Sequence, residues 1–570
     1  MKWWLKKQLL RLKLYIAENY QNEAESLVIW YAVCYAMGAA VYLVLPWEIS
    51  VWVIILYLEI ILLLLYLTHR HDAVFKSLTY IAVFILGLSV AKADALYRQS
   101  KMETTLPKVN YIYGHIEDIE HNNSGNIRIT LRGVDNFERD LKGLFRISTR
   151  QNKYWLKQDA CIETVVQMPH NYTVNPLGNY DYERALFYQG VSAAGYTISP
   201  IFKSDCKHNA SYIKNKINSL RSNIAEIIDH NTSTDQGSII KALTIGDKKS
   251  ITSQQATNYR IAGLAHILAI SGMHMGMIAL LIFFLIRIIL LPFSFGEHDW
   301  RKPSAIIALL STLGYFMISG QSISCIRAFI MTSLILIAIL FNRRAISLRL
   351  WALAILIVVT FMPYAVISPG FLMSFGAVLG LIAFYDKKKS NIHSWYKSRH
   401  LLGKISVYII GIVIADAIAS LMTLPYTLYY FHQISVYTTL GNFFAGPLVA
   451  FWIMPTLLLF LISIPLGLAT YTLKPLSWGI DILNKIAELV SSLAGADSGT
   501  NLPQMSDISI VLITLGLLWL CIWQQKWRYW GFALIIIGFF IFSHAPKADF
   551  VFDEGGKTFA CRADDGKLHS

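Results

Sequence analysis

Hydrophobic residues gather in long runs that recur from one end of the chain to the other. A helix of about 20 apolar residues crosses a bilayer, and runs near or above this length lie near residues 27–45, 50–67, 77–92, 261–286, 303–320, 322–341, 345–362, 368–385, 405–430, 436–470, 507–523 and 530–544. Their number and length predict a polytopic α-helical membrane protein with about eleven transmembrane segments.

The placement of Lys and Arg between the runs predicts the orientation of the chain. Basic residues crowd the N-terminus and return after the second run at Arg70 and Lys76. Because Lys and Arg are enriched in cytoplasmic loops, we expect a cytoplasmic N-terminus and, after three crossings, an external position for residue 100. The basic turn near Lys526 then predicts an external C-terminus.

One apolar run is interrupted by helix-breaking residues. Residues 436–470 contain Gly441, Gly446, Pro447, Pro455 and Pro465. Such breaks are typical of re-entrant or discontinuous membrane helices. We therefore expect either two helices or a re-entrant pair in this region.

The stretch from Ile261 to Ile286 is apolar but not a plain anchor. It contains no Lys, Arg, Asp or Glu, and it carries His266, Ser271 and His274 together with three glycines. Polar groups at membrane depth cost free energy unless they meet a partner or a wet cavity. A packed helix with satisfied polar groups and a pore, gate or binding site therefore both remain open as interpretations.

Residues 105–235 have a different pattern. Residues 109–116 and 126–132 alternate apolar and polar positions, as strands do, and residues 122–125 form a turn signal between them. Further strand-like pieces follow at 144–149 and 160–166. Short strands at this spacing predict a small β-barrel of the OB type, followed by helices over residues 211–260.

A basic run lies within this predicted barrel and is interleaved with aromatic residues. Its members are Lys142, Arg146, Arg150, Lys153, Tyr154, Trp155 and Lys157. Positive charge combined with stacking rings is the pattern by which proteins hold single-stranded nucleic acid. A solvated face of a charge-balanced domain is the alternative interpretation.

Composition supports the membrane assignment and excludes several kinds of site. The chain has 570 residues, of which 55% are hydrophobic, and its net charge of +14 fits basic cytoplasmic loops without requiring nucleic acid. The six cysteines form no CxxC pair. Cys161 and Cys206 lie in the predicted exported region and are candidates for a disulfide.

Three charged residues lie inside apolar runs. Arg327 must pair or face water, and Asp416 is its most obvious counter-ion within the membrane. The two residues either line a path or lock helices together. Glu59, in the second run, is expected to serve helix packing or local proton exchange.

Several short motifs, taken in order, resemble the ComEC family of DNA-uptake channels. The segment from Gly263 to His274 (GLAHILAISGMH) is similar to the most diagnostic signature of that family. The other motifs are the segments 175–182, 188–196, 243–248 (with Gly246 and Asp247), 322–328 (with Ser324), 368–375, 423–425 and 442–447 (ending at Pro447). The resemblance covers residues 105–545.

The resemblance implies a channel that imports single-stranded DNA across the cytoplasmic membrane. Charge and hydrophobic pattern predict a basic cytoplasmic segment 1–26, three membrane helices in 27–104 and an external strand-like tail in 546–570. Between them, the resemblance implies an external OB-like domain in 105–235 and a channel domain in 236–545. A polyanion requires a polar path through the membrane, for which the candidates are His266, Ser271, Gly272, His274, Arg327, Asp416 and Asn442. Expected partners are a DNA receptor outside, a cytoplasmic ATPase or DNA-binding protein, and a separate nuclease.

The chain departs from many members of that family near its C-terminus. They carry a metallo-β-lactamase-like domain whose HxHxDH cluster binds metal, and no such cluster or ATP-binding P-loop occurs in this sequence. We therefore expect no nuclease activity, no metal and no cofactor. Two alternatives stay open: a truncated channel without transport activity, and an intramembrane hydrolase that uses Ser271 as nucleophile and His274 as base.

Overall fold

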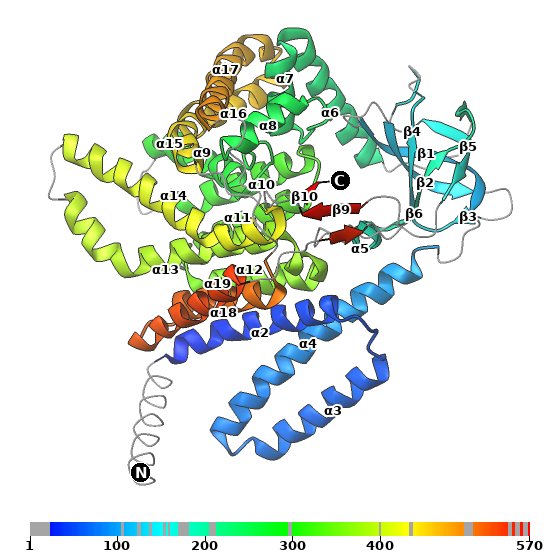
Figure 1. Ribbon diagram of the computed structural model, residues 1–570. Coiled ribbons are helices and arrows are strands. Elements are labelled where there is room, and N and C mark those ends of the chain that lie inside the picture. Colours follow the sequence, from blue (N-terminus) through cyan, green and yellow to red (C-terminus); the bar gives the residue numbers. More distant parts are fainter. Residues whose placement is uncertain are drawn as a thin grey trace, which may run out of the picture. The chain divides into compact units, whose positions relative to one another are not determined.

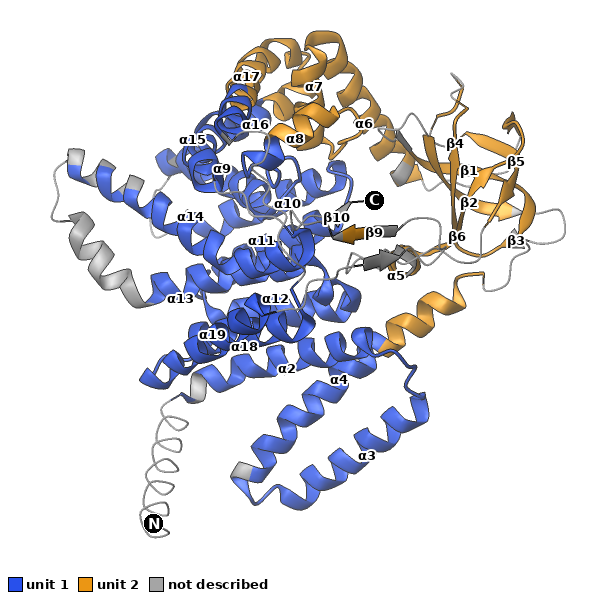
Figure 2. Ribbon diagram, viewed as in Figure 1, with its two compact units in different colours: residues 1–91, 259–459, 485–546 blue, residues 92–258, 460–484, 547–570 orange. Residues whose placement is uncertain are grey.

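The protein is described here from a computed structural model of the whole chain (Figure 1). The structure describes residues 23–103, 108–121, 127–135, 140–151, 155–157, 160–168, 182–204, 212–293, 299–397, 401–432, 437–494, 505–544, 550–552, 559–562 and 568–569. Two compact units are distinguished in Figure 2, and each is considered by itself. Unit 1 comprises residues 1–91, 259–459 and 485–546, and unit 2 comprises the remainder.

Unit 1 is built from long apolar helices. They are α2 (Ala24–Val44), α3 (Val51–Thr68), α4 (Asp72–Ser100, which continues into unit 2), α9 (Gly272–Leu290), α10 (Arg301–Ile318), α11 (Ile323–Leu340), α12 (Leu348–Phe361), α13 (Pro369–Lys397), α14 (Leu401–Phe431), α15 (Thr438–Leu448), α18 (Asp507–Ile522) and α19 (Trp530–Ser543). Short 3₁₀ turns lie at η1 (Leu291–Phe293), η2 (Pro363–Ile367) and η5 (Lys526–Tyr529).

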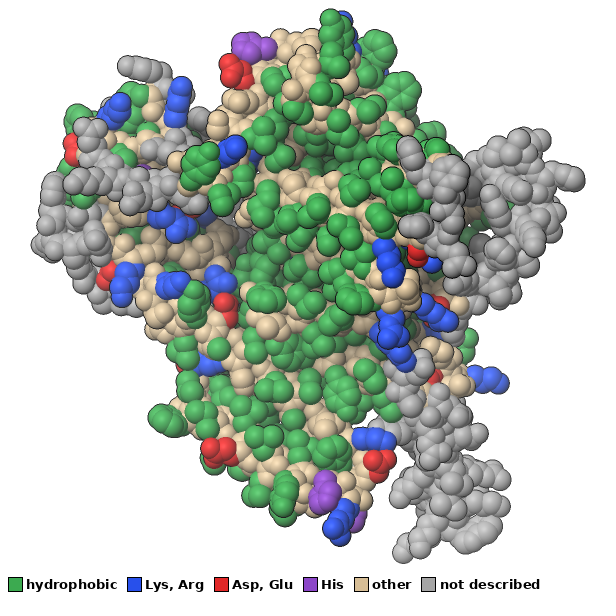
Figure 3. Space-filling model, turned by 180° about the vertical axis from the view of Figure 1, so that it is seen from behind, with side chains coloured by type: hydrophobic (Ala, Val, Ile, Leu, Met, Phe, Trp, Pro, Cys, Tyr) green, Lys and Arg blue, Asp and Glu red, His purple; other side chains and the backbone are tan. Residues whose placement is uncertain are grey.

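The length and apolar character of these helices suit a bilayer. Within the described ranges, nine helices are long and apolar enough to cross a membrane, and α12 and α18 are shorter apolar helices. On the face shown in Figure 3, hydrophobic side chains cover a broad area. The predicted class of polytopic helical membrane protein is confirmed in this coarse form, although the exact number of crossings stays a prediction.

Glycines allow several of these helices to approach one another closely. A Cβ atom on Gly38 of α2 would lie 2.8 Å from the carbonyl carbon of Phe84 in α4, and one on Gly87 would lie 2.8 Å from that of Tyr35. Membrane helices associate through such small residues because lipid supplies no hydrophobic driving force between them. The α2–α4 contact therefore depends on both glycines.

The expected break in residues 436–470 is not a pair of helices. A continuous helical segment runs through α15, a π-helical turn η3 (Val449–Ile453), α16 (Met454–Ser463) and the 3₁₀ turn η4 (Ile464–Leu466). Pro447 lies inside α15, and the wider π turn follows it directly. A local π adjustment reconnects the backbone around a proline, so the helix continues past it.

Five strands of unit 2 close into a barrel. The strands of this domain are β1 (Val109–His121), β2 (Ile127–Asp135), β3 (Asp140–Leu141), β4 (Leu144–Thr149), β5 (Cys161–Gln167), β6 (Val191–Thr197) and β7 (Phe202–Lys203). Pairing follows the closed order β1–β2–β4–β6–β5–β1, in which only β4 and β6 run parallel. The strand predictions are confirmed, while the predicted turn at 122–125 lies outside the described residues.

The barrel core follows from strict alternation along the strands. Ile127, Ile129 and Leu131 of β2 point inward and are buried, as are Phe145 and Ile147 of β4. The residues between them face outward because successive side chains of a strand point to opposite sides. This alternation decides which polar side chains the barrel presents to solvent.

Helices and short strands complete unit 2. They are α5 (Tyr182–Tyr188), α6 (Tyr212–Asn231), α7 (Thr234–Thr244), most of α8 (Ser253–Ile261), part of α17 (Ala469–Ala494), and the antiparallel strands β8 (Phe550–Phe552), β9 (Phe559–Arg562) and β10 (Leu568–His569). Thr252 caps the start of α8, since its Oγ1 accepts a hydrogen bond from the Gln255 backbone N–H at 3.2 Å.

Candidate polar path in the helical unit

The apolar stretch 261–286 is not one helix. Helix α8 ends at Ile261, turns occupy residues 262–271, and α9 begins at Gly272. Gly263 has φ +73°, its N–H donates to the Arg260 carbonyl, and the N–H of Leu264 donates to the Tyr259 carbonyl. This pair of bonds is the Schellman motif that ends helices at a left-handed glycine. The segment therefore places His266 in the turns and His274 in the first turn of α9.

The turn segment packs against α15 through two glycines. A Cβ atom on Gly263 would lie 2.6 Å from the Cα atom of Thr438, at the start of α15. A Cβ atom on Gly441, one turn along that helix, would overlap the carbonyl oxygen of Ala262. Both positions need glycine because backbone meets backbone there. The following residue of α15, Asn442, is thereby held beside the turn segment.

Asn442 donates a hydrogen bond to a carboxylate within the helical unit. Its Nδ2 lies 2.7 Å from Asp416 Oδ1, on α14. The other carboxylate oxygen of Asp416 is buried and has no hydrogen-bond partner in the described structure. His266 lies in the neighbourhood of both Asp416 and His274. We call His266, Ser271, His274, Asp416 and Asn442 the polar cluster.

Ser271 and His274 form a helix cap at the start of α9. The backbone N–H of Ser271 donates to His274 Nδ1 at 3.2 Å, and Ser271 Oγ lies 3.1 Å from the same nitrogen. The His274 side chain is fully buried, and its Nε2 has no partner among the described residues. The ring thus accepts the backbone N–H of the N-cap residue, in the manner of a capping box.

Ala265 and His266 are the two exposed residues of the turn segment. Leu264, Ile267 and Leu268 are buried, whereas His266 is exposed, and its Nδ1 lies 3.1 Å from the Gly263 carbonyl oxygen. Cβ atoms on Gly272 and Gly276, at the start of α9, would meet nothing within 4 Å. Open space therefore borders both the turn segment and one side of α9.

Arg327 is not paired with Asp416. Its side chain is buried on α11, and its Nη2 donates to Ser324 Oγ at 3.1 Å. The guanidinium lies against α13, where a Cβ atom on Gly370 would be 2.6 Å from Nη2. The expected counter-ion was wrong: Asp416 Oδ1 accepts a hydrogen bond from Asn442, and Arg327 donates to Ser324. Arg327 instead fills a site that Gly370 leaves open.

Two further motif residues, Gly246 and Asp247, shape the loop before α8. Gly246 has φ +73°, and Asp247 Oδ1 accepts a hydrogen bond from the Lys249 N–H at 2.9 Å. Lys249 Nζ in turn lies 2.7 Å from Asp118 Oδ1 on β1. This loop therefore joins the helices of unit 2 to the barrel, and neither motif residue belongs to the polar cluster.

Only some side chains of the basic run in the barrel are exposed to solvent. Lys142, Arg150 and Lys157 are exposed, and Arg146 on β4 donates from Nη2 to Gln189 Oε1 at 2.7 Å. Trp155 packs against the barrel core and is therefore not a free stacking platform. The predicted residues Lys153 and Tyr154 lie outside the described residues.

Two arginines on the outward side of β2 were missed by the sequence analysis. Arg128 pairs with Ser148 across the β2–β4 ladder, and Thr130 pairs with Arg146. Arg132, further along β2, forms an ion pair with Glu117 at 2.5 Å. Strict alternation with the buried isoleucines of β2 was the signal that could have identified both arginines.

Cysteines and metal ligands add little to the candidate site. Cys161 is disulfide-bonded, and because Cys206 lies outside the described residues, the predicted pairing of the two stays a prediction. Over the described ranges, no group of three or more His, Cys, Asp or Glu side chains is arranged to hold a metal ion.

Comparison with known proteins finds one matching family model and several relatives. The sequence model of the Competence protein family matches residues 243–527. The chain is 28% identical over 333 residues to ComE operon protein 3 of Bacillus subtilis, covering 58% of this chain and 39% of that protein. It is 22% identical over 491 residues to Recombination protein 2 of Haemophilus influenzae, covering 85% and 57%.

A third relative is Competence protein ComA of Neisseria gonorrhoeae, which is 26% identical over 270 residues, or 45% of this chain and 36% of that protein. The chain thus spans between 36% and 57% of the lengths of these three relatives. No solved structure matches the chain.

Proposed function

The chain belongs to the competence protein family, whose model matches half of its length, and we propose that it forms a channel for DNA uptake in natural transformation. The proposed substrate is single-stranded DNA, and the proposed location is the cytoplasmic membrane. In this arrangement the N-terminus is cytoplasmic, while the barrel and the C-terminus are outside. The names of the relatives and the polar features of the helical unit support this proposal.

The interruption between α8 and α9 is the observation that carries the proposal. Irregular backbone at membrane depth is tolerated only where protein buries it or where it borders a water-filled cavity. Residues 262–271 are irregular, His266 within them is exposed, and open space lies beside Gly272 and Gly276. A wet path at this point would let a polyanion exchange water for polar groups.

Within that path, each member of the polar cluster has a different part. His266 and Asn442 supply N–H donors for phosphate oxygens or bases. Asp416 is a positioning residue, because its carboxylate accepts the Asn442 amide N–H at 2.7 Å. His274 and Ser271 hold the start of α9 beside the path, and Arg327 contributes positive charge from α11.

The capping geometry favours transport over hydrolysis. A nucleophile–base pair requires a third group that orients the base. His274 Nδ1 already accepts the Ser271 backbone N–H, and its Nε2 lacks a partner in the described structure. We therefore assign no enzymatic role to this pair and propose that energy and strand degradation come from partner proteins.

The barrel is proposed to be an OB-like domain that receives the strand outside the membrane. Its closed order with one parallel pair, β4–β6, fits a five-stranded Greek-key barrel. In OB domains the second and third strands bind oligonucleotides. The corresponding strands β2 and β4 present Arg128 and Arg146 outward.

Import of fluorescent DNA into the cytoplasm tests the channel proposal. Deletion of the gene should abolish import, and the unaltered chain should restore it. Asn442→Leu removes the N–H donor and leaves Asp416 unpaired. Loss of a buried hydrogen bond of this kind costs about 1–3 kcal/mol, which corresponds to about a 5- to 150-fold fall in import.

Phe443→Leu is the matched control, because it introduces the same side chain at the next, exposed position of α15. This control should import DNA like the unaltered chain, at equal amounts of protein in the membrane fraction. Unchanged import after deletion would overturn the channel proposal. Absence of import by the unaltered, inserted chain would instead favour a membrane protein without transport activity. Reporter fusions after residues 100, 390 and 560 test the out, in, out orientation.

A further inference from the structure

Four tryptophans meet where α2 begins and where α18 connects to α19. They are Trp30 of α2, Trp519 of α18, and Trp523 and Trp527 of the turn 523–529, which we call the α18–α19 turn. The centroids of contacting rings lie 4.4–6.0 Å apart. Trp523 and Trp527 are only 5% and 8% exposed. These four residues, the tryptophan cluster, therefore form a buried aromatic group at the ends of three helices.

A buried carboxylate joins the same two segments. Glu23 Oε1 accepts the backbone N–H of Gln524 at 2.7 Å and also that of Gln525, while its Oε2 accepts the Ser26 hydroxyl at 2.7 Å. The start of α2 and the α18–α19 turn therefore lie at the same end of the helical unit. Both are ends of candidate membrane spans. This contact supports the sequence-based prediction that the N-terminus and the basic turn share one side of the membrane.

The cluster carries buried N–H donors that lack acceptors. Within the described residues, four such atoms have no hydrogen-bond partner: Nε1 of Trp30, Trp523 and Trp527, and Nε of Arg528. The Trp519 N–H differs, since it donates to the Trp527 carbonyl oxygen at 3.1 Å. The Glu23 carboxylate already accepts three hydrogen bonds. A buried donor without a partner costs free energy, so four of them around one turn indicate a missing acceptor.

Positive charge and open aromatic surface lie beside these donors. Lys526 is exposed and Arg528 is partly exposed. Tyr529 and Trp530, which follow directly, are 60% and 67% exposed. Cationic side chains together with Tyr and Trp at the end of a membrane helix are typical of the boundary between lipid and water. The α18–α19 turn therefore offers cations to head groups and aromatic rings to the adjoining acyl chains.

We propose that the tryptophan cluster and Arg528 bind the phosphate group of an anionic phospholipid. The phosphate and ester oxygens of a phospholipid only accept hydrogen bonds, and they match the four N–H groups without partners. The two cations Lys526 and Arg528 outnumber the Glu23 carboxylate, which favours a head group with net negative charge. Basic pockets between membrane helices at the cytoplasmic surface bind such head groups.

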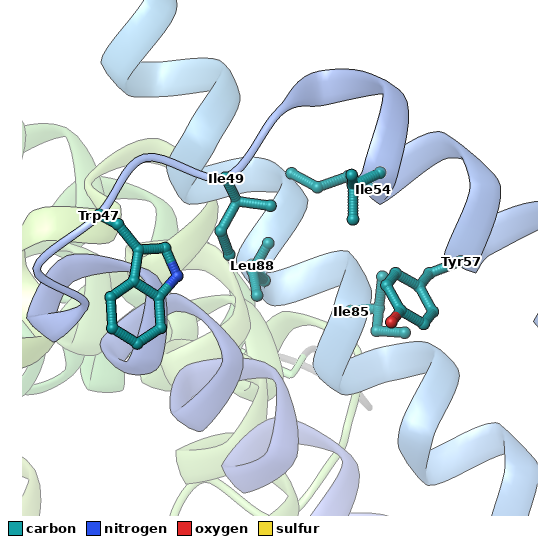
Figure 4. A pocket seen from close by; sticks show the side chains of 7 residues that line it. Trp47, Ile49, Ile54, Tyr57, Ile85 and Leu88 are labelled. Carbon is teal, nitrogen blue, oxygen red and sulfur yellow. The ribbon is translucent and has the colours of Figure 1, made fainter.

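The cavity between α3 and α4 provides a contrast. It measures about 370 Å³ and is lined by side chains that include Ile54, Tyr57, Ile85 and Leu88. Figure 4 shows Ile54 and Tyr57 of α3 on the side that faces Ile85 and Leu88 of α4. None of its lining residues in the described structure is charged. This cavity offers nothing that distinguishes one head group from another, so selection of an anionic lipid depends on the α18–α19 turn.

Lipid binding to the purified full-length chain tests the proposal. The chain in detergent is titrated with phosphatidylglycerol or phosphatidylcholine, and native mass spectrometry gives a dissociation constant for each lipid. Phosphatidylglycerol should bind about five- to thirty-fold more tightly, the range expected for one or two cations near a lipid surface. Inorganic phosphate at the same concentration should not displace it, because free phosphate lacks the acyl chains that contact Tyr529 and Trp530.

Two pairs of variants separate the charge from the indole donors. Arg528→Gln removes a charged donor and should weaken phosphatidylglycerol binding about 10- to 150-fold. Arg343→Gln is its matched control, because Arg343 is exposed on another turn, and it should weaken binding less than about five-fold. Trp527→Phe keeps a ring but removes an N–H without a partner, and should weaken binding about two- to thirteen-fold. Trp519→Phe removes an N–H that already has an acceptor, and should leave the affinity unchanged.

Several results would overturn the proposal. Equal affinity for the two lipids, or equal losses within either pair of variants, would exclude a selective lipid site at the cluster. Displacement of phosphatidylglycerol by inorganic phosphate would indicate a site for free anions, and displacement by a single-stranded oligonucleotide would indicate a contact for DNA instead. The inference rests on the membrane location of the chain and not on DNA transport, which the import assay measures separately.

Discussion

Replacement of Gly263 by alanine should separate the packing role of the α8–α9 turn from its backbone conformation. Gly263 has φ +73°, and a Cβ atom there would lie 2.6 Å from the Cα atom of Thr438. The change therefore imposes two costs. One is the left-handed conformation of a residue that carries a Cβ, and the other is a collision with the backbone of α15.

The two free-energy costs differ in magnitude, and only the collision displaces a neighbouring helix. A left-handed conformation costs about 1–2 kcal/mol for a residue other than glycine. Ordinary contact begins at 3.4 Å, so the start of α15 must move by about 0.8 Å from its 2.6 Å position. Overpacking of this kind costs about 1–3 kcal/mol, and the total for Gly263→Ala is about 2–5 kcal/mol.

Movement of α15 extends the effect to the polar cluster. Asn442 lies one turn beyond Thr438, and its 2.7 Å bond to Asp416 would lengthen to as much as about 3.5 Å. A hydrogen bond to a charged group contributes about 1.5–3 kcal/mol. DNA import should therefore fall about 10- to 150-fold, beyond any effect of lower protein abundance.

Gly467→Ala is the matched control. Gly467 also has a positive φ, +70°, and a Cβ atom there would meet nothing within 4 Å. It should lose only the conformational cost, about 1–2 kcal/mol, and should import DNA normally. Stability is measured by thermal unfolding in detergent, and import is normalised to the amount of chain in the membrane. If both variants lost equal stability and imported equally well, the contact with Thr438 would not position Asn442.

Two further predictions concern other parts of the chain. Burial and the hydrogen bond that its hydroxyl donates to Glu163 raise the pKa of Tyr111 to about 12 from 10.0. The folded state therefore favours the neutral phenol, which stabilises the protein. This stabilisation is complete below pH ~10 and is lost as the pH rises through ~12. Tyr111→Phe should therefore flatten the fall in melting temperature over that window, and an unchanged fall would exclude the coupling. Gly38→Ala should destabilise the α2–α4 contact by about 1–3 kcal/mol, whereas Gly314→Ala, with open space at its Cβ, should not; equal melting of the two variants would contradict the close packing.

Long periodic patterns were sufficient to predict most elements of the fold. The runs near 322–341 and 507–523 correspond to α11 (Ile323–Leu340) and α18 (Asp507–Ile522), and the alternation at 109–116 corresponds to the start of β1. Membrane helices and strands must satisfy their own backbone or that of a neighbour, so their hydrophobic period is strongly constrained. The local hydrophobic pattern is therefore enough to locate these helices and strands.

Predictions that depended on contacts between distant segments failed. The helix ends after Ile261, where Gly263 packs against Thr438. The residues of the stretch 261–286 alone do not indicate that contact. Opposite charge suggested that Arg327 would pair with Asp416. Charge alone does not show whether two residues lie close together in the fold, and Asp416 is hydrogen-bonded to Asn442 instead. Prolines in residues 436–470 suggested a break that a π-helical turn absorbs.

The structure also separates two kinds of residue within the motifs. Gly263 and Gly441 bring the turn segment and α15 into backbone contact. His266, three residues after Gly263, and Asn442, directly after Gly441, carry the polar groups that this contact assembles around Asp416. Substitution of either glycine should therefore impair transport by displacing intact polar groups, whereas Asn442→Leu should impair it without displacing α15. The two variants should lower import to a similar extent, while Gly263→Ala should lose about 2–5 kcal/mol of stability and Asn442→Leu about 1–3 kcal/mol.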